Sequence, residues 1–400
     1  NSVVHADSAS TLVVVGGKIT EEKTITGGQL KKDSDGNFEL IHQISNTERP
    51  DPKDLFSNDN RALLDKFGRI DYKFVTTPGS YEEIQPNDSI WNTRNVGQQI
   101  YVQIMYPDSR GASLNFTNQY VPVKLVVQGI GDQLQDATNL KGKDITAHVV
   151  NTGDASSYVN GLISANSTIS YTDANGDEHN DVSLSSLAAG ANTQINTFFW
   201  RTTPDLTQID TNGTDHNITV GFADGSSITI PFKVTVAGAT AAANQTVTSM
   251  TQPSAVQASQ AVTDLPQGAT VAGWVDATEN ITTHEFDHVT NNPTYATTWA
   301  APHTSTPAFV KVHYADGTDQ IVKVTLNINS LSDSDVGNHY SAVASTDTHY
   351  GHTFTNDEAI PLIKNGNTAL DATHVGHTGD EVRSVAWVSV PATNVAAADM

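Results

Sequence analysis

A pattern of two alternating strands joined by a turn recurs three times in this chain, at a spacing close to the size of a domain. In its clearest copy, FVKVHYADGTDQIVKVTL, the apolar residues Val310, Val312 and Tyr314 alternate with the polar residues Lys311 and His313. A period of two places the apolar side chains on one face of a strand and the polar side chains on the other. Each copy is therefore predicted to be a β-hairpin with one buried face.

Turn signals separate the two strands of each copy. Asp224-Gly225 and Asp316-Gly317 are predicted to reverse the chain, because glycine accepts the positive φ angle that tight hairpin turns require. The first copy has a looser loop that begins at Pro107. Repeats of this kind at a domain-sized period predict tandem β domains.

Tryptophans recur together with these hairpins. Trp200 lies 109 residues after Trp91 and 99 residues before Trp299. Because each tryptophan accompanies a predicted strand, we expect them to belong to domain cores rather than to sugar-stacking platforms. The five tryptophans of the chain are Trp91, Trp200, Trp274, Trp299 and Trp387.

A further strand pattern precedes the hairpins of the later copies. It comprises residues 167–184 and residues 269–280, and residues 381–394 (EVRSVAWVSVPATN) are similar to the latter. No Asp-Gly hairpin follows residues 381–394. The chain is therefore expected to stop inside a fourth unit.

These patterns divide the chain into successive units. The predicted units are an N-terminal β-rich domain (1–128), a β-sandwich repeat (129–238), a linker or edge segment (239–262), another β-sandwich repeat (263–330) and a partial fourth β repeat (331–400). One short helix is expected in the N-terminal unit, with Asn58 to Asn60 able to cap its start and Gly68 its end. Two readings of the N-terminal region stay open, a degenerate repeat and a distinct binding domain.

Composition narrows the classes of partner. The formal net charge of −23, from 21 basic and 44 acidic residues, would repel a phosphate backbone or an anionic lipid surface, so no nucleic-acid partner is expected. The absence of cysteine rules out disulfides and thiolate zinc sites. No stretch approaches the roughly 18–20 apolar residues of a membrane span, so no membrane insertion is expected.

One sequence motif suggests an enzyme. His284-Glu285-Phe286-Asp287-His288 matches H-E-x-x-H, which on a helix presents two imidazoles to zinc and a glutamate to the attacking water. However, β-branched residues surround the motif, and Pro293 follows within five residues of His288. The segment VTNNPT after His288 also lacks a third ligand. We therefore expect a coincidental match, and a zinc-dependent hydrolase is the alternative function.

Two other groups of residues resemble cation sites. Asp173, Asn175, Asp177 and Asp181 have the alternating oxygen ligands of a calcium loop, but the same residues also predict an Asn-Gly hairpin turn, which we favour. Nine of the 14 histidines lie beyond residue 280 and are expected in solvated loops, including the pairs His349/His352 and His374/His377. These histidines would gain positive charge below about pH 6.5, which suggests a pH-sensitive surface.

A resemblance to a known family rests on residues 295–328, YATTWAAPHTSTPAFVKVHYADGTDQIVKVTLNI. This segment resembles the Rib/alpha-like tandem repeats of Gram-positive bacterial surface proteins. The similarity extends over residues 265–328, is weaker over residues 166–236, and departs from the family at Ala315, where proline is usual. The resemblance implies tandem Ig-like β-sandwich domains and a stalk, adhesin or surface-layer (S-layer) role without an active site.

The predicted fold is thus all-β, and the predicted function is that of an exported, non-catalytic cell-surface or cell-wall protein. Val4-His5-Ala6 resembles the small-residue end of a secretory signal. The expected partners are a host glycan or matrix protein, or identical subunits in a surface lattice, with a cell-wall polymer possible through a missing part of the protein. The sequence assigns no catalytic residue, cofactor or metal ligand.

Overall fold

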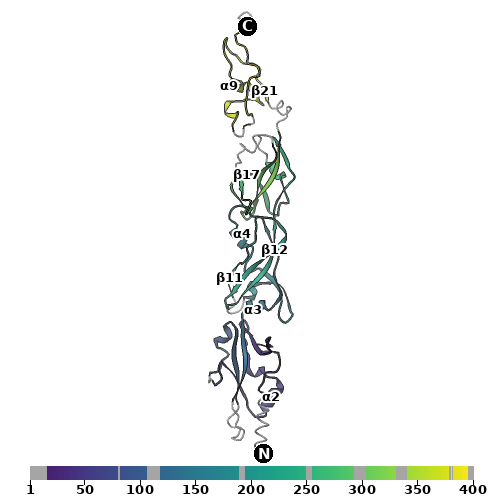
Figure 1. Cartoon of the computed structure of the whole chain (residues 1–400), viewed down its shortest axis with the longest axis vertical. Coiled ribbons are helices and arrows are strands. Elements are labelled where there is room, and N and C mark those ends of the chain that lie inside the picture. The colour runs from purple at the N-terminus through teal and green to yellow at the C-terminus, as the bar shows by residue number, and fades with distance from the viewer. Residues whose placement is uncertain are drawn as a thin grey trace, which may run out of the picture. The chain divides into compact units, whose positions relative to one another are not determined.

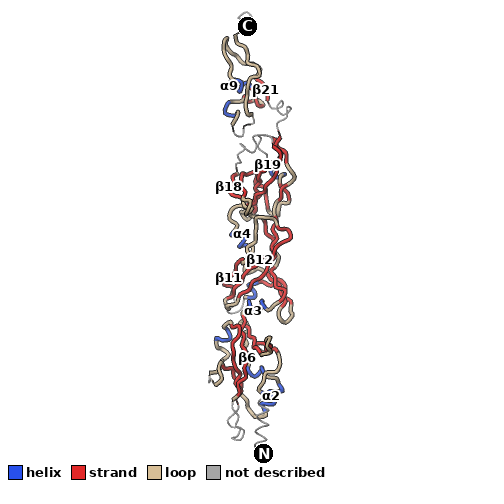
Figure 2. The backbone as a smooth tube through the Cα atoms, viewed as in Figure 1, coloured by secondary structure: helices blue, strands red, loops and turns tan. Residues whose placement is uncertain are grey.

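The computed structural model describes residues 16–79, 82–105, 118–188, 194–248, 255–291, 303–329, 340–377, 380 and 382–394 (Figure 1). Strands predominate in this part of the chain, and short helices connect them (Figure 2). The chain divides into two compact units. Unit 1 comprises Asn1–Ile145, Asn160–Pro204 and Thr214–Val234, and unit 2 comprises Thr146–Val159, Asp205–Gly213 and Thr235–Met400.

The first sheet contains six strands in the order β1-β2-β3-β6-β5-β4. Strands β5 and β6 form the first predicted hairpin and pair antiparallel, whereas β3 pairs with β6 in parallel. The loop predicted to begin at Pro107 lies outside the described residues. The strands are β1 (Lys23–Ile25), β2 (Gly28–Lys32), β3 (Phe38–Gln43), β4 (Asp71–Val75), β5 (Asn95–Met105) and β6 (Gln119–Gln128).

Short helical segments contribute to the core of this sheet. The 3₁₀ helix η1 (Pro52–Leu55) supplies Leu55, and helix α2 (Asn58–Asp65) supplies Leu64; both side chains are fully buried. Helix α2 confirms the predicted helix, but its cap differs from the prediction. Ser57 Oγ accepts from the backbone N–H of Asn60, because Ser57 is the last extended residue before the helix.

Trp91 lies in the 3₁₀ helix η2 (Ser89–Asn92), not in a strand, and its side chain is 1% exposed in the same core. Its indole packs edge-on against Phe74 and against His42 at a centroid distance of 5.4 Å. The buried His42 places Nδ1 at 2.6 Å from the carbonyl oxygen of Gly27, so Nδ1 donates. The predicted assignment of Trp91 to a core is confirmed, although its backbone is helical.

The buried His42 gives this core a pH dependence. Burial, with a smaller contribution from the charge of Arg49, lowers the pKa of His42 below 6.5. The unfolded chain therefore binds a proton before the folded chain does, and stability falls as the pH drops below about 6.5, by at most about 1.4 kcal/mol per pH unit for one proton. We expect His42→Gln, which keeps a donor, to remove this slope in denaturation measured between pH 7 and pH 5. An unchanged slope would contradict the assignment.

Two facing sheets form the second structural region, with the predicted sandwich arrangement. A three-stranded sheet has the order β10-β9-β7, and a four-stranded sheet has the order β11-β12-β13-β8. They approach so closely that a Cβ atom at Gly142 in β7 would lie 2.1 Å from the ring of Phe232 in β13. The strands are β7 (Thr138–Gly142), β8 (Ile145–His148), β9 (Thr168–Thr172), β10 (Glu178–Ser183), β11 (Ile195–Trp200), β12 (Asp210–Phe222) and β13 (Ser227–Ala237).

The second predicted hairpin is β12–β13. The N–H of Phe222 donates to the carbonyl oxygen of Ser226, and Gly225 at the turn has a φ angle of 87°, as the Asp-Gly signal predicts. Trp200 at the end of β11 is buried beside this hairpin. The short helices of the region are α3 (Ile130–Gln135), α4 (Ser156–Gly161) and α5 (Leu184–Leu187).

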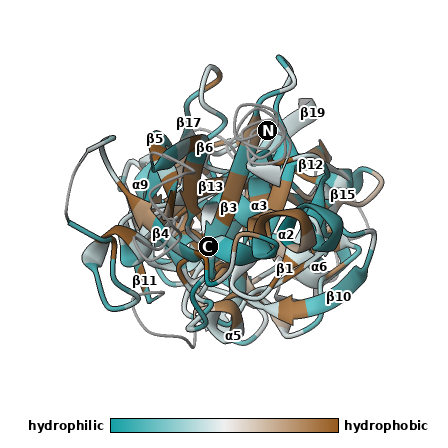
Figure 3. Cartoon of the chain, turned by 90° about the horizontal axis from the view of Figure 1, so that it is seen from below, coloured by the Kyte–Doolittle hydropathy of each residue, from teal (hydrophilic) through white to brown (hydrophobic). Residues whose placement is uncertain are grey.

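A five-stranded sheet in unit 2 contains the third predicted hairpin, β19–β20, with Gly317 at a φ angle of 89°. Apolar and polar residues appear in contrasting colours on its strands and on those of unit 1 (Figure 3). Trp274 of β17 is buried in this core, whereas Trp299 lies outside the described residues. The strand order is β15-β20-β19-β17-β18, with β15 (Gln245–Thr248), β17 (Ala269–Glu279), β18 (Phe286–Thr290), β19 (His303–Tyr314) and β20 (Asp319–Asn329).

The segment predicted as a linker or edge contributes to this domain. Strand β15 pairs in parallel with β20 at the edge of the sheet. Helix α6 (Ala255–Gln260) places Ala258 in the core, and Ala261 follows it there. The segment therefore contains an edge strand, and its small alanine side chains allow close packing. Strands β14 (Thr240–Ala241) and β16 (Val262–Thr263) pair with each other.

The last described region has a small sheet in the order β21-β22-β23. The strand predicted within residues 381–394 is not found in the described residues 382–394, where Val382 forms a single isolated bridge with Val375. Trp387 is half-buried, and its indole N–H donates to the carbonyl oxygen of Thr355. The elements are β21 (Tyr340–Ala342), α9 (Asn356–Ala359), η3 (Ile360–Leu362), β22 (Ile363–Asn365), β23 (Thr368–Ala369) and η4 (Ala372–His374).

Candidate functional site

The H-E-x-x-H residues do not lie on a helix. His284 and His288 have positive φ angles of 61° and 50°, and strand β18 begins between them at Phe286. Phe286 is buried against Phe309, whereas the His288 side chain is 79% exposed and pairs with Asp287. Among the described residues, no three histidine, aspartate or glutamate side chains are grouped to hold a metal ion. The zinc-hydrolase alternative therefore has no support.

Residues 173–177 form the predicted hairpin turn between β9 and β10, and Asp181 lies within β10. Asp173 Oδ1 accepts from the backbone N–H groups of Asn175 and Asp177, and Gly176 has a φ angle of 87°. Asp173 Oδ2 lies 2.9 Å from His179 Nε2. The hydrogen bond from His179, followed by those from the backbone, lowers the pKa of Asp173. The oxygen atoms of Asp173 thus have partners within the turn, which favours a structural role.

The histidines share one feature that the sequence did not predict. Among the described residues, seven histidines pair with a nearby carboxylate. His374 and Asp371 are an exposed example: their hydrogen bond raises the pKa of His374, and hydrogen bonds from Thr373 and His374 lower the pKa of Asp371 to about 2. The pairs are His148/Asp316, His179/Asp173, His288/Asp287, His313/Asp319, His352/Glu358, His374/Asp371 and His377/Asp380.

In unit 1, the turn of the second hairpin binds the chain that follows the first hairpin. Asp224, which is 8% exposed, accepts from the backbone N–H of Ile130 at 2.8 Å, and Ser226 Oγ accepts from that of Gly131 at 2.9 Å. A Cβ atom at Gly131 would lie 2.7 Å from the backbone oxygen of Ser227, so this contact requires glycine. We call these contacts the Asp224 joint.

A bidentate ion pair lies beside the Asp224 joint. Arg94 Nε and Nη2 donate to the two carboxylate oxygens of Asp132 at 2.8 and 2.7 Å. Asp132 Oδ2 also accepts from the backbone N–H of Gly129 and so caps the first turn of α3. The hydrogen bond to Asp132 raises the pKa of Arg94. The ion pair thus connects the start of β5 to the chain between the two hairpins.

Unit 2 contains a similar connection with different chemistry. The amide of Asn151, which is 6% exposed, donates to the carbonyl oxygen of Ile321 at 2.9 Å and accepts from its N–H at 2.8 Å. The amide of Gln320 makes the same two contacts with the backbone of Ala239, at 2.9 and 3.0 Å. We call these contacts the Asn151 joint. It connects β20 to the chain just after β8 and to the chain just after β13.

An aromatic cluster lies beside the Asn151 joint. The His148 ring stacks on Tyr314 at a centroid distance of 3.6 Å and on Tyr158 at 4.2 Å, and its Nε2 lies 2.7 Å from Asp316 Oδ2. Burial raises the pKa of both tyrosines. For Asp316, burial raises the pKa, but hydrogen bonds from Thr318 and His148 outweigh it and lower the pKa overall. The contacts of Asp316 with His148 and Thr318 thus hold the Asp-Gly turn of the third hairpin in place.

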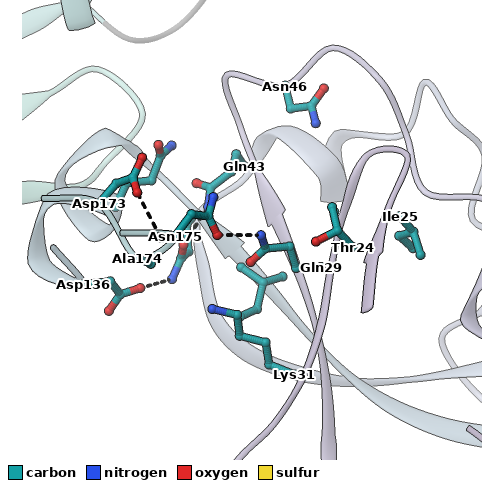
Figure 4. A pocket seen from close by; sticks show the side chains of 14 residues that line it. Thr24, Ile25, Gln29, Lys31, Gln43, Asn46, Asp136, Asp173, Ala174 and Asn175 are labelled. Atoms are coloured by element: carbon teal, nitrogen blue, oxygen red, sulfur yellow. Dashed lines mark hydrogen bonds between the residues drawn. The ribbon is translucent and has the colours of Figure 1, made fainter. Parts of the chain in front are cut away.

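Unit 1 also contains a pocket with a volume of about 320 Å³ (Figure 4). Strands β1 to β3, the end of β6, helix α3 and the turn at Asp173 contribute its lining, which includes Lys31, Asp136 and Ile41. Gln29 Nε2 donates to Asn175 Oδ1 at 3.4 Å across it. Six of its 14 lining residues have amide side chains: Gln29, Gln43, Asn46, Gln128, Gln133 and Asn175.

Sequence reasoning found the turns but not their partners. It identified Asp224-Gly225 and Asp316-Gly317 as hairpin signals, and both aspartates prove to bind chain far away in the sequence. Neither the pocket nor the two joints has a signature of residue spacing, since their members come from strands, turns and a helix distributed over unit 1 or unit 2. The single usable signal for the pocket is the density of glutamine and asparagine around residues 29, 43 and 128–135.

None of the helices in the described part of the chain combines the length and the apolar character that crossing a membrane requires. No family model and no curated protein matches the chain. Among solved structures, it is similar to Drosophila N-cadherin EC1-4, with 10% identity, 65% of this chain and 67% of that chain covered, and a TM-score of 0.13. It is also similar to an I-band fragment of titin, with 8% identity, 66% of this chain and 89% of that chain covered, and a TM-score of 0.18.

The extracellular cadherin domains 1-5 of protocadherin gamma B2 give 10% identity, with 73% of this chain and 59% of that chain covered, and a TM-score of 0.13. By its strand pairing and core packing, the chain is an all-β protein of tandem β domains.

Proposed function

We propose that the chain is a non-catalytic protein of the bacterial cell surface, in which tandem β domains form a stalk that presents binding surfaces outside the cell. The observation behind this proposal is the pair of joints. In each joint, a hairpin of one domain binds the chain that leads out of a preceding strand, through groups that are buried and hydrogen-bonded. Such contacts hold a hairpin and the chain that precedes it together within unit 1 and within unit 2, which supports a load-bearing stalk.

The wider chemistry agrees with a structural role. The resemblance of residues 265–328 to Rib/alpha-like repeats supports a Gram-positive cell-wall protein. The strong negative charge favours solubility outside the cell and disfavours nucleic acid. Two versions of the function follow, an adhesin that binds a host glycan or matrix protein and a surface-layer protein that binds identical subunits.

Electron microscopy of the purified protein and of intact producing cells tests the proposal. We expect the labelled protein on the cell surface. If the protein is an adhesin, the purified sample should contain separate particles. An ordered lattice formed by the purified protein alone would assign the surface-layer version. Protein found only inside the cell would overturn both versions.

The Asn151 joint gives the same proposal a second test. Replacing Asn151 by alanine leaves the buried N–H and C=O of Ile321 without these partners, at a cost of about 1–3 kcal/mol for each unpaired group. We expect limited proteolysis of the Asn151→Ala protein to cut near residues 148–152 much faster than in the wild type. Asn367→Ala, in the exposed turn between β22 and β23 of the same unit, is the matched control and should leave that rate unchanged.

A further inference from the structure

The amide groups of the unit 1 pocket have a fixed order along one wall. A carboxylate can only accept hydrogen bonds, so Asp136 Oδ2 requires the amide nitrogen of Gln128, which lies at 2.9 Å. Gln128 Oε1 then accepts from Gln43 Nε2 at 2.8 Å. In this order Gln43 donates through Nε2, and its Oε1 atom makes no hydrogen bond with Gln128 or Asp136. It remains a buried acceptor without a hydrogen-bond partner.

A buried donor without a partner lines the same pocket. Gln133 Nε2, on helix α3, is shielded from solvent and has no hydrogen-bond partner. Nearly all buried polar atoms in folded proteins are paired, so an unpaired donor and an unpaired acceptor in one pocket require an explanation. Gln43 and Gln133 both line the pocket, and glutamine side chains have three rotatable bonds.

We infer that this pocket binds a neutral saccharide that carries an acetamido group. Hydroxyl groups both donate and accept, and an acetamido group offers one N–H and one C=O, which complement Gln43 Oε1 and Gln133 Nε2. The pocket volume of about 320 Å³ lies in the usual range for small-ligand sites. Ile25 and Ile41 supply apolar surface for the carbon face of the sugar ring.

Charge decides against acidic saccharides. The lining includes one cationic side chain, Lys31, against the two carboxylates Asp136 and Asp173, and the chain as a whole has a net charge of −23. An anionic ligand would therefore be repelled both locally and at long range. The inference deepens the adhesin version of the proposed function, since it names the class of ligand.

Binding of N,N′-diacetylchitobiose to the full chain, measured by saturation-transfer NMR and calorimetry, tests the inference. We expect binding by the wild type and at least about tenfold weaker binding by Gln133→Leu, because the substitution removes the donor. Thermal stability should stay the same or rise in this variant, since leucine also removes an unpaired buried group. Weaker binding with unchanged stability separates loss of the site from loss of the fold.

The controls define what would overturn the inference. Gln267→Leu replaces an exposed glutamine in unit 2 and should bind as the wild type does. Cellobiose, which lacks acetamido groups, should bind more weakly, and a glucuronic acid disaccharide should not bind. Failure of the wild type to bind diacetylchitobiose at millimolar concentration, or equal binding by Gln133→Leu, would refute the site.

A competition experiment distinguishes two sources of the saccharide. Purified cell-wall glycan from a producing cell and glycans released from mucin both present acetamido sugars, and competition with diacetylchitobiose ranks them. A surface-located protein that binds none of these probes would remove the pocket proposal and keep the surface role. A protein that is found only inside the cell but binds these probes would keep the pocket proposal and remove the surface role.

Discussion

Replacement of Trp91 by alanine is expected to lower the free energy of unfolding of the six-stranded sheet by about 3–5 kcal/mol, the usual cost of truncating a buried tryptophan. The side chain is 1% exposed, packs against His42 and Phe74, and donates from Nε1 to the carbonyl oxygen of Gln85 at 3.0 Å. The substitution would leave a cavity and would remove one of the two hydrogen bonds that the carbonyl oxygen of Gln85 accepts, the other coming from the N–H of Asp88. Native-state hydrogen exchange of β5 and β6 measures the loss locally.

Phe199→Ala provides the matched control for this measurement. Phe199 is an aromatic residue of β11 that is 50% exposed, so its removal creates no buried cavity. We expect a change of less than about 1 kcal/mol there. A loss of similar size in both variants would show that Trp91 does not organise its core.

Replacement of Asp224 by alanine should cost about 3–5 kcal/mol in unit 1, because the carboxylate is a charged acceptor for several buried groups and each such hydrogen bond is worth about 1.5–3 kcal/mol. The backbone N–H groups of Ile130 and Ser226 would both lose their acceptor. Hydrogen exchange at residues 129–136 should then accelerate before exchange in the neighbouring strands. Urea denaturation followed by circular dichroism gives the total loss.

Asp316→Ala is the comparison for Asp224→Ala, since it removes the corresponding aspartate of the third hairpin. Its side chain is 39% exposed, so solvent can replace the lost contacts with Thr318 and His148. We expect a clearly smaller loss of stability than for Asp224→Ala. An equal loss would mean that burial of Asp224 in the joint contributes little.

Local patterns in the sequence were sufficient to predict the hairpins. Alternation along residues 309–326 and the Asp-Gly pairs predict β19, β20 and their turn, because strand faces and turn geometry depend on adjacent residues. The same reasoning failed for residues 382–394, where apolar alternation is present but, among the described residues, the pairing is limited to the isolated bridge between Val382 and Val375. A strand needs a partner, and the identity of that partner is not a local property.

The candidate sites were less predictable for a related reason. The pairing of Asn151 with Ile321 joins residues 170 positions apart, and nothing in either segment specifies the other. Buried amides such as Gln133 also resemble exposed ones in sequence. By contrast, the unsuitability of the H-E-x-x-H segment for a helix followed from its β-branched neighbours, and the structure agrees.

The amide side chains in the Asn151 joint behave like an added peptide unit. Asn151 and Gln320 each offer one N–H and one C=O to a backbone, as a neighbouring strand would, and neither amide carries a charge. Dissolved ions weaken contacts between charges but leave such neutral pairs almost unaffected. The contacts of Asn151 and Gln320 within unit 2 should therefore persist at high salt concentration and at acidic pH, since neutral amides do not titrate there.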